Sequence, residues 1–312
     1  MTLTQLEYIV ALATHRHFAH AAEQCYVTQP TLSMQIQKLE DELGVKLFDR
    51  TKQPVIPTEA GEPIIAQARI VLQEAEAIKE QAANQKNNLG GELRLGIIPT
   101  LAPYLLPPLY KQLQQKYPAI KFTIKELVTE QIVWELKNNL LDCAIVVTPL
   151  QDATIKEDIL FYEELFVYIS PRHQLNQKKY VLASDIDPQQ LLLLEEGHCF
   201  RSQILNLCEL RQKSNLQFKY ETGNIETLKR MVEKSDGLTI LPEMAVRELT
   251  KAQQQLVKPL QKPRPVREIS LITHRHHIKT RLIKTVKEEI LQTIPKPMRQ
   301  LANKKVVEIG GV

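Results

Sequence analysis

The chain contains 312 residues, which is too many for one typical core and indicates two or three compact units. Hydrophobic residues make up 43% of it, and no apolar run approaches the ~20 residues of a membrane span. The first residues lack the basic start and the cleavage site of a secretory signal, so we expect a cytoplasmic protein without membrane contact. Thiols are normally reduced in that compartment, so the four cysteines do not indicate a structural disulfide framework.

Charge is distributed unevenly along the chain. Residues 1–88 carry eight Lys/Arg and eleven Asp/Glu, whereas residues 258–312 carry thirteen Lys/Arg and four Asp/Glu. A basic patch is the usual footprint of a nucleic-acid-binding module. Charge alone would therefore place the nucleic-acid-binding module at residues 258–312. The sequence motifs are needed to locate it.

The first sixty residues have the pattern of a helix-turn-helix followed by a small ribbon. Residues 3–14 and 18–25 place apolar and small residues at helical spacing. Thr-Gln-Pro at 28–30 suits a helix start, since threonine caps helices and proline is tolerated in the first turn. The following helix has an apolar stripe, a polar outer face and a stop at Gly44. Alternating apolar residues around a basic turn at 45–58 predict a β-ribbon, the wing.

A long helix from 59 to about 85 repeats apolar or small residues at four-three spacing, which is a heptad seam. The seam predicts dimerisation, and a dimer suits paired DNA half-sites. Pro63 is unusual early in such a helix, and we expect it to shift or bend the helix start. The predicted dimerisation row consists of Ile64, Ala68, Val71, Ala75, Ile78 and Ala82.

Beyond a break at 87–91, strands alternate with helices. The expected helices lie at about 103–116, 130–140, 203–212, 224–234 and 278–292. This alternation is typical of α/β sheets, whose ligands bind near the strand ends. The expected strands are Leu93–Ile98, Lys121–Leu127, Cys143–Val147, Leu165–Ser170, Leu191–Leu194, Leu238–Leu241 and Ile269–Thr273.

One stretch resembles the DNA-binding domain of LysR-type transcriptional regulators. AAEQCYVTQPTLSMQIQKLEDELGVKLFDR at 21–50, followed by PTEAG at 57–61, carries nearly the whole family pattern. The resemblance implies a winged helix-turn-helix at 1–58, a dimerising linker helix at 59–89 and an α/β regulatory domain at 90–312. It further implies two Rossmann-like lobes similar to periplasmic binding proteins, at approximately 90–163 with 268–300, and at 164–267.

The resemblance places DNA contacts near the start of the second motif helix and on the wing. Short polar groups there reach base edges or phosphates, and basic wing residues reach phosphates. Without the resemblance, a solvated helix face explains each polar residue about as well. Gln37 and Gln53 stand where related regulators often have arginine, which leaves affinity and sequence preference open. The expected DNA-binding residues are Gln29, Pro30, Thr31, Ser33, Gln35, Lys38, Arg50 and Lys52.

A second stretch resembles the redox segment of the peroxide-sensing LysR-type regulators. It reads EEGHCFRSQ at 195–203 and is followed by Cys208, and GIIPT at 96–100 and PYLLP at 103–107 extend the similarity. The resemblance implies that hydrogen peroxide oxidises Cys199 and that Cys208 resolves the product as a reversible disulfide. The disulfide would change the conformation and the oligomer geometry on DNA, and so control antioxidant genes. Ser202 departs from the pattern, because those regulators often have an acid there.

The residues around Cys199 favour this chemistry on their own. Cys199 follows Gly197 and His198 and precedes an expected helix, so helix-start N–H groups and the imidazole are expected to lower the pKa of its thiol. A thiolate attacks the O–O bond of peroxide and gives a sulfenic acid. Two buried, inert cysteines are the commoner explanation of an arbitrary pair, but the His-Cys context inside a LysR-type sensor favours the redox interpretation.

The resemblance also supplies polar partners for the cysteine. Thr100 matches a hydroxyl that holds peroxide at the end of the first sensor strand, and Thr129 matches a second hydroxyl nearby. Arg267 matches an arginine near the active cysteine, with Arg264 as a competitor for that role.

The other candidate ligands are interpreted as structural. Cys25 and Cys143 are expected in the core of a helix and a strand. The histidine-rich stretch at 274–277 lacks carboxylate or cysteine partners at metal-binding spacing, so we interpret it as a surface loop. We expect no metal and no cofactor.

Three functions stay open. The first is a peroxide-responsive regulator rather than an enzyme, with double-stranded DNA of dyad symmetry and hydrogen peroxide as partners. It would act as a homodimer or homotetramer, and the family implies RNA polymerase and a glutaredoxin- or thioredoxin-type reductant as further partners. The second is a LysR-type regulator that binds a small metabolite between the lobes. The third is a thiol peroxidase, which would leave the winged helix without a role. A solute-binding protein is disfavoured by the missing signal sequence.

Overall fold

The computed structural model describes residues 1–85, 90–194, 199–208, 224–275, 277–301 and 304–307. The chain divides into two compact units, Met1–Asn88 with His276–Lys279, and Leu89–Arg275 with Thr280–Val312. Among the described residues, no helix combines the length and the apolar character that crossing a membrane requires.

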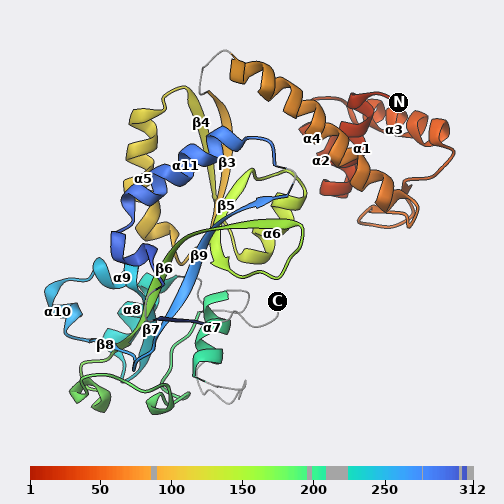
Figure 1. Cartoon of the computed structure of the whole chain (residues 1–312). Coiled ribbons are helices and arrows are strands. Elements are labelled where there is room, and N and C mark those ends of the chain that lie inside the picture. The colour runs from red at the N-terminus through yellow and green to blue at the C-terminus, as the bar shows by residue number, and fades with distance from the viewer. Residues whose placement is uncertain (86–89, 195–198, 209–223, 276, 302–303, 308–312) are drawn as a thin grey trace. The chain divides into compact units, whose positions relative to one another are not determined.

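The first unit is a winged helix-turn-helix (Figure 1). The second helix of the motif is α3, which spans Gln29–Leu43. The Thr28 hydroxyl caps its start, Pro30 lies in its first turn, and Gly44 ends it in the left-handed conformation at φ 70°. Ile9, Leu32 and other apolar residues of the helices form its core. Its elements are α1 (Leu3–His15), α2 (Phe18–Gln24), α3 (Gln29–Leu43), the antiparallel wing strands β1 (Phe48–Asp49) and β2 (Ile56–Pro57), and α4 (Gly61–Gln85).

α4 begins at Gly61, two residues later than expected, because Thr58 caps it. The Thr58 hydroxyl accepts a hydrogen bond from the Gly61 N–H at 2.9 Å and donates one to the Lys46 carbonyl at 2.6 Å. A Cβ at position 61 would collide with the Leu47 carbonyl oxygen, so this close approach requires glycine. Pro63 falls in the first turn of α4, where proline is tolerated.

The second unit is built around a mixed sheet whose strands follow the order β4-β3-β5-β9-β6-β7, with β10 beside β9 and β8 beside β6 (Figure 1). β3 runs parallel to β4 and β5, whereas β9 runs antiparallel to β5 and β6. The strands are β3 (Gly91–Ile97), β4 (Ile120–Glu126), β5 (Cys143–Thr148), β6 (Ile155–Ile169), β7 (Leu238–Pro242), β8 (Val257–Pro259), β9 (Arg264–His274) and β10 (Lys304–Val306).

Helices cover this sheet, and two separate buried apolar clusters form beneath them. One cluster gathers β3, β5, α5 and α11, the other gathers β7, α7 and α8, and the long strand β6 contributes to both. The expected fold class, a winged helix-turn-helix with a two-lobed α/β domain, is confirmed. The α-helices are α5 (Ala102–Lys116), α6 (Thr129–Lys137), α7 (Cys199–Leu207), α8 (Ile225–Lys234), α9 (Glu243–Arg247), α10 (Lys251–Gln254) and α11 (Thr280–Thr293), and short 3-10 helices span Gln174–Gln177, Ala183–Asp185 and Lys296–Arg299.

Several expected elements need correction. The strand expected at Leu191–Leu194 is only an isolated bridge between Leu191 and Leu238. The strand expected at Leu165–Ser170 is the second half of β6, and the first half, in which Lys156, Glu157 and Asp158 follow one another, was missed. The helix expected at 203–212 begins four residues earlier, at Cys199, and its last residues lie outside the described part of the chain.

Candidate DNA-reading surface and redox site

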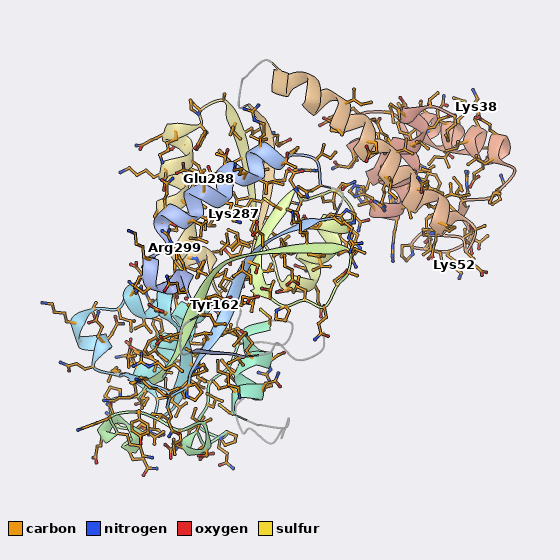
Figure 2. All side chains as sticks on the ribbon, viewed as in Figure 1. Lys38, Lys52, Tyr162, Lys287, Glu288 and Arg299 are labelled. Atoms are coloured by element: carbon orange, nitrogen blue, oxygen red, sulfur yellow. The ribbon has the colours of Figure 1, made fainter. Side chains whose placement is uncertain are left out.

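The outer face of α3 presents the polar residues expected to read DNA. Lys38 on α3 and Lys52 on the wing turn are exposed, and Figure 2 shows both side chains at the surface of the first unit. The Thr31 hydroxyl shares a 2.8 Å hydrogen bond with the Thr28 hydroxyl, which fixes it at the start of α3. Gln29 and Pro30 are exposed, and Thr31, Ser33 and Gln35 are half-buried.

Arg50 is held against α3 instead of extending away from the wing. Its guanidinium donates to the Ser33 hydroxyl at 3.3 Å and to the Glu40 carboxylate at 3.2 Å, and it lies 5.4 Å from the ring of Phe18. Glu40 is buried and also accepts the Leu47 N–H at 2.8 Å. Because one carboxylate binds both the wing backbone and its arginine, Glu40 fixes the position of the wing beside α3.

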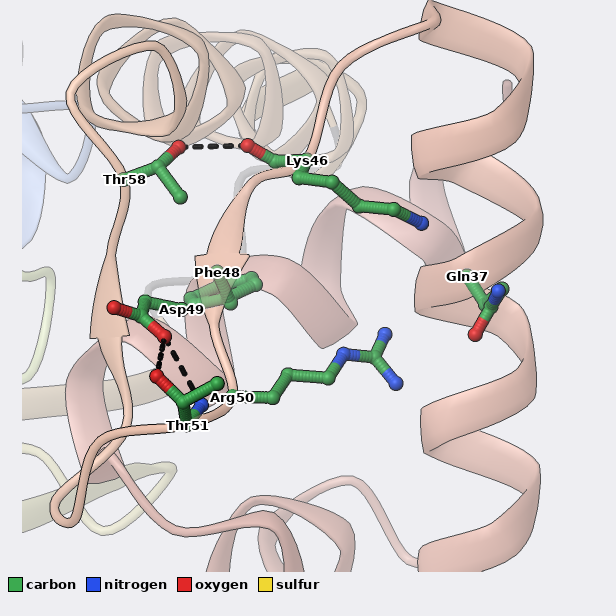
Figure 3. Close-up of a pocket in the computed structure, with 7 residues that line it drawn as sticks. All are labelled: Gln37, Lys46, Phe48, Asp49, Arg50, Thr51 and Thr58. Atoms are coloured by element: carbon green, nitrogen blue, oxygen red, sulfur yellow. Dashed lines mark hydrogen bonds between the residues drawn. The ribbon is translucent and has the colours of Figure 1, made fainter.

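An open depression separates the wing from α3 (Figure 3). Arg50 and Gln37 face each other across it, and Asp49 holds the turn by accepting from the Thr51 N–H at 3.0 Å and its hydroxyl at 2.6 Å. Position 37 thus contributes an uncharged amide to this depression. The lining residues are Gln37, Lys46, Phe48, Asp49, Arg50, Thr51 and Thr58.

The predicted dimerisation row on α4 splits into two parts. Ala68 is 3% exposed inside the core of its own unit, and Ile64 and Val71 pack against the same core. The expectation that Ala68 faces a partner is therefore wrong for the single chain described. Ile78 is 69% exposed and Ala75 is half-buried, so these two positions remain for a partner, and the side chain of Ala82 lies outside the described part.

Cys199 and Cys208 occupy the two ends of α7 and are both reduced and buried. Cys199 is the first residue of the helix and packs in the cluster that gathers β3, β5, α5 and α11. Cys208 follows the helix, donates its N–H to the Ile204 carbonyl at 3.0 Å, and packs in the other cluster. α7 therefore joins the two apolar clusters. His198, expected beside the thiol, lies outside the described residues.

The arginine near the cysteine is Arg267. It is fully buried in β9, donates from Nη1 to the Thr100 hydroxyl at 2.8 Å and from Nη2 to the Thr100 carbonyl at 3.3 Å, and its Cζ lies 5.1 Å from the ring of Phe200. Its charge acts on the Cys199 thiol. Arg264 instead forms a 2.8 Å ion pair with Glu164 near the surface. The geometry thus brings together Thr100, Arg267 and Cys199.

Two buried polar atoms near Cys199 have no hydrogen-bond partner among the described residues, Thr129 Oγ1 and Gln203 Oε1. The Thr129 hydroxyl makes no hydrogen bond of good geometry, yet it lies close enough to the thiol to stabilise the thiolate. Gln203 lies four residues after Cys199 and hence on the same face of α7. Buried polar atoms are normally satisfied, so this pair offers hydrogen bonds to a small polar guest.

The pKa of the Cys199 thiol corrects our expectation. Burial raises it, and this effect exceeds the lowering by the Thr129 hydroxyl, by the charge of Arg267 and by the N–H groups at the start of α7. Burial also raises the pKa of Cys208 to about 11. Both cysteines are therefore thiols at neutral pH in this state.

The other two cysteines occupy core positions, as expected. Cys143 is buried in β5, and Cys25 is half-buried at the end of α2, where burial raises the pKa of its thiol. Within the described part of the chain, no three His, Cys, Asp or Glu side chains gather as a metal site would require.

The chain matches two family models. Residues 3–62 match the bacterial regulatory helix-turn-helix protein of the lysR family, and residues 86–295 match the LysR substrate binding domain. The chain belongs to the LysR family of transcriptional regulators. Among its relatives, it is 39% identical over 272 residues to the "DNA-binding transcriptional dual regulator OxyR" of Escherichia coli K12, covering 87% of this chain and 89% of that protein. The "HTH-type transcriptional regulator EstR" of Acinetobacter baylyi is 34% identical over 88% of this chain and 91% of its own length.

Solved structures of LysR regulators agree with this fold. Full-length OxyR from Pseudomonas aeruginosa is 37% identical with a TM-score of 0.77, covering 93% of this chain and 98% of that one. A hydrogen-peroxide-bound mutant of OxyR from Corynebacterium glutamicum is 27% identical with a TM-score of 0.60, covering 93% and 92%.

The sequence did not lead us to three polar residues, Glu163, Glu40 and Gln203, each of which occupies a buried position of its strand or helix. Glu163 shares the alternating buried register of Phe161 and Leu165 in β6. Glu40 follows Leu39 on the buried side of α3, and Gln203 is one turn from Cys199. A polar residue at an apolar position of the pattern was the signal that could have found them.

Proposed function

We propose that the chain is a hydrogen-peroxide-responsive, DNA-binding transcription regulator in which Cys199 reacts with peroxide and Cys208 resolves the product. The observation that carries the proposal is the setting of Cys199. The thiol stands at the start of α7 beside the Arg267–Thr100 pair, and two buried polar atoms, Thr129 Oγ1 and Gln203 Oε1, have no hydrogen-bond partner among the described residues. Hydrogen peroxide is small enough for such a site and can both donate and accept hydrogen bonds. The relatives named hydrogen peroxide-inducible genes activator, from Dickeya chrysanthemi among others, support the choice of oxidant.

The reaction uses only the chain's thiols and peroxide. The Cys199 sulfur bonds to one peroxide oxygen while the O–O bond breaks, and the other oxygen leaves with the thiol proton as water. The Cys208 sulfur then attacks the sulfenic sulfur, the S–O bond breaks, and the hydroxyl leaves with the Cys208 proton as a second water. Two electrons pass from the thiols to the peroxide.

The second step requires α7 to unwind. Nine residues of helix separate two Cα atoms by about 13 Å along the axis, whereas a disulfide needs them within about 7 Å. Each cysteine would also leave its own apolar cluster, so the apolar clusters on both sides of α7 must repack. We infer that this repacking carries the oxidation signal to the oligomer.

The regulator reads DNA with the outer face of α3 and the wing, at 1–58. The linker at 59–89, which contains α4, joins the chains as a homodimer or homotetramer, and residues 90–312 sense the oxidant. We expect an operator of dyad symmetry, RNA polymerase as the regulated partner, and a glutaredoxin- or thioredoxin-type protein to restore the thiols in the cytoplasm.

The test is thiol trapping with mass spectrometry after micromolar peroxide. We expect a Cys199–Cys208 disulfide in the parent protein, a trapped sulfenate on Cys199 in Cys208→Ser, and neither product in Cys199→Ser. Cys25→Ser is the matched control and should behave like the parent. A regulatory response that persists in Cys199→Ser would favour a metabolite sensor, and sustained turnover of peroxide with a reductant would favour a peroxidase.

A further inference from the structure

Next to the redox site lies a fully buried ion pair between two strands. Glu163 of β6 and Arg267 of β9 are direct cross-strand partners, and both are 0% exposed. Nε of Arg267 donates to Oε2 of Glu163 at 2.8 Å, and Nη2 lies 2.7 Å from the same oxygen in the ion pair. Cross-strand neighbours point to the same face of a sheet, so the register of β6 and β9 itself sets this contact.

The carboxylate is fixed from a second side. Its other oxygen accepts the Met244 N–H of α9 at 2.7 Å, so both oxygens of Glu163 are engaged by groups on different elements. The part of the guanidinium that Glu163 leaves free turns toward Thr100, and the ring of Phe200, the residue after Cys199, lies beside it. The guanidinium is therefore held between Glu163 on one side and the redox site on the other.

We propose that Glu163 is a positioning residue for the redox site, because it holds the charge of Arg267 against Thr100 and beside Cys199. This inference rests on the proposed function. A buried guanidinium without a carboxylate is strongly disfavoured, so Arg267 would turn away from the thiol if Glu163 lost its charge. Among the described residues, Arg267 acts on the thiol, Tyr104 of α5 and Glu243 of α9 interact electrostatically with the ion pair, and Glu226 of α8 accepts a hydrogen bond from the Tyr104 hydroxyl at 2.6 Å.

Two effects on Cys199 follow from the loss of Glu163. The Thr100 hydroxyl loses the donor that fixes its orientation, so its own proton is no longer directed to a guest. The thiolate loses a nearby positive charge, which raises the pKa of Cys199 further. Below its pKa, a thiol is about tenfold less ionised for each unit by which the pKa rises.

The variant that tests this is Glu163→Gln, with Glu164→Gln as the matched control. Glu164 is the next residue of β6 and pairs with Arg264 near the surface, so the same atoms are exchanged outside the site. We expect Glu163→Gln to slow sulfenate formation at Cys199 by about tenfold or more, and Glu164→Gln to stay within about twofold of the parent. Alkylation of Cys199 by iodoacetamide, followed by peptide mass spectrometry, should show its pH midpoint raised by about one unit only in Glu163→Gln.

A double-mutant cycle separates positioning from a merely structural role. If Glu163 acts through Arg267, adding Glu163→Gln to Arg267→Met should change neither the oxidation rate nor the alkylation midpoint further. Equal slowing in the two backgrounds would overturn the inference, and so would a parental rate and midpoint in folded Glu163→Gln. Should Glu163→Gln not fold, Glu163→Asp keeps the charge on a shorter arm. We then expect the alkylation midpoint within about half a unit of the parent with a slower oxidation, and a parental oxidation rate would reject the inference.

The iodoacetamide alkylation experiment uses no peroxide, so its outcome does not depend on whether Cys199 senses peroxide. A parent protein that peroxide leaves reduced at Cys199 would refute the proposed function, while the alkylation midpoints would still decide whether Glu163 positions the charge of Arg267.

Discussion

Thr100 connects the buried ion pair to the redox site through a single hydroxyl. That hydroxyl accepts from Arg267, so its own hydrogen is available to a guest beside Cys199. Thr100→Val keeps the shape of the side chain and removes this acceptor. We expect sulfenate formation at Cys199 to slow by about tenfold or more, with a loss of about 1–3 kcal/mol in the free energy of unfolding because a buried arginine N–H is left unpaired.

Thr148→Val provides the control for the Thr100 variant. Thr148 is equally buried, but it belongs to β5, and its hydrogen bonds among the described residues join it to Glu268 at 2.7 Å and to Ser270 at 2.6 Å rather than to Arg267. It should lose similar stability in urea titrations and oxidise at the parental rate. Equal oxidation rates of the parent and Thr100→Val would remove Thr100 from the mechanism.

The raised pKa of Cys208 makes the stability of the reduced protein depend on pH. Burial raises the pKa from 9.0 to about 11, so the folded state keeps a proton that the unfolded chain loses. The contribution of the thiol is complete below pH 9 and is lost as the pH rises toward 11, by up to about 2–3 kcal/mol. Urea unfolding under reducing conditions should show a flatter decline between these pH values in Cys208→Ala than in the parent. Parallel curves would mean that the thiol is not buried in solution.

At the scale of elements, α7 is the part that has to change. Oxidation should abolish the amide protection that its helical hydrogen bonds provide, because the Cys199–Cys208 bond cannot form on an intact helix. Hydrogen exchange across 199–208 should therefore increase sharply on oxidation in the parent and stay constant in Cys208→Ser. Exchange at α1, which packs on α4 in the separate core of the first unit, serves as the internal reference. A disulfide-bonded protein with unchanged exchange in α7 would refute the unwinding step.

The elements that sequence predicted well are those with one clean periodicity. α3 has an apolar stripe, a capping threonine and a terminating glycine, and its bounds follow from these local signals. β6 was half missed because its outer part, from Ile155, pairs with β9 while exposing charged residues. The expected DNA contacts and the cysteine pair came from motifs. Glu163 could not be predicted from a motif, because its role depends on Arg267, which is 104 positions away in the sequence and which strand pairing places opposite it.

At the scale of the whole molecule, DNA binding should depend steeply on salt. Each lysine or arginine that neutralises a phosphate contributes about one unit to the slope of log affinity against log salt. Lys52→Ala on the exposed wing turn should reduce this slope by about one and weaken binding to all DNA sequences alike.

Ser33→Ala should weaken binding to the operator more than binding to random DNA, because Ser33 lies on the outer face of α3 and accepts a hydrogen bond from Arg50. Lys178→Ala, whose lysine pairs with Asp185 in the second unit, should leave the slope unchanged in filter-binding titrations.

The contact between Val307, just after β10, and α7 has a consequence that a genetic selection can reveal. Val307 donates its N–H to Val266 at 2.8 Å beside Arg267, and its carbonyl accepts from the buried amide of Gln203 in α7 at 3.0 Å. Deleting β10 and Val307 would leave that amide without an acceptor and so penalise the wound helix relative to the unwound one. In a reporter strain grown without peroxide, truncations that remove residues from 304 onward should then mimic the oxidised regulator. Such alleles would map about a hundred codons from either cysteine, and a selection for peroxide-independent reporter output of the oxidised type should recover them repeatedly.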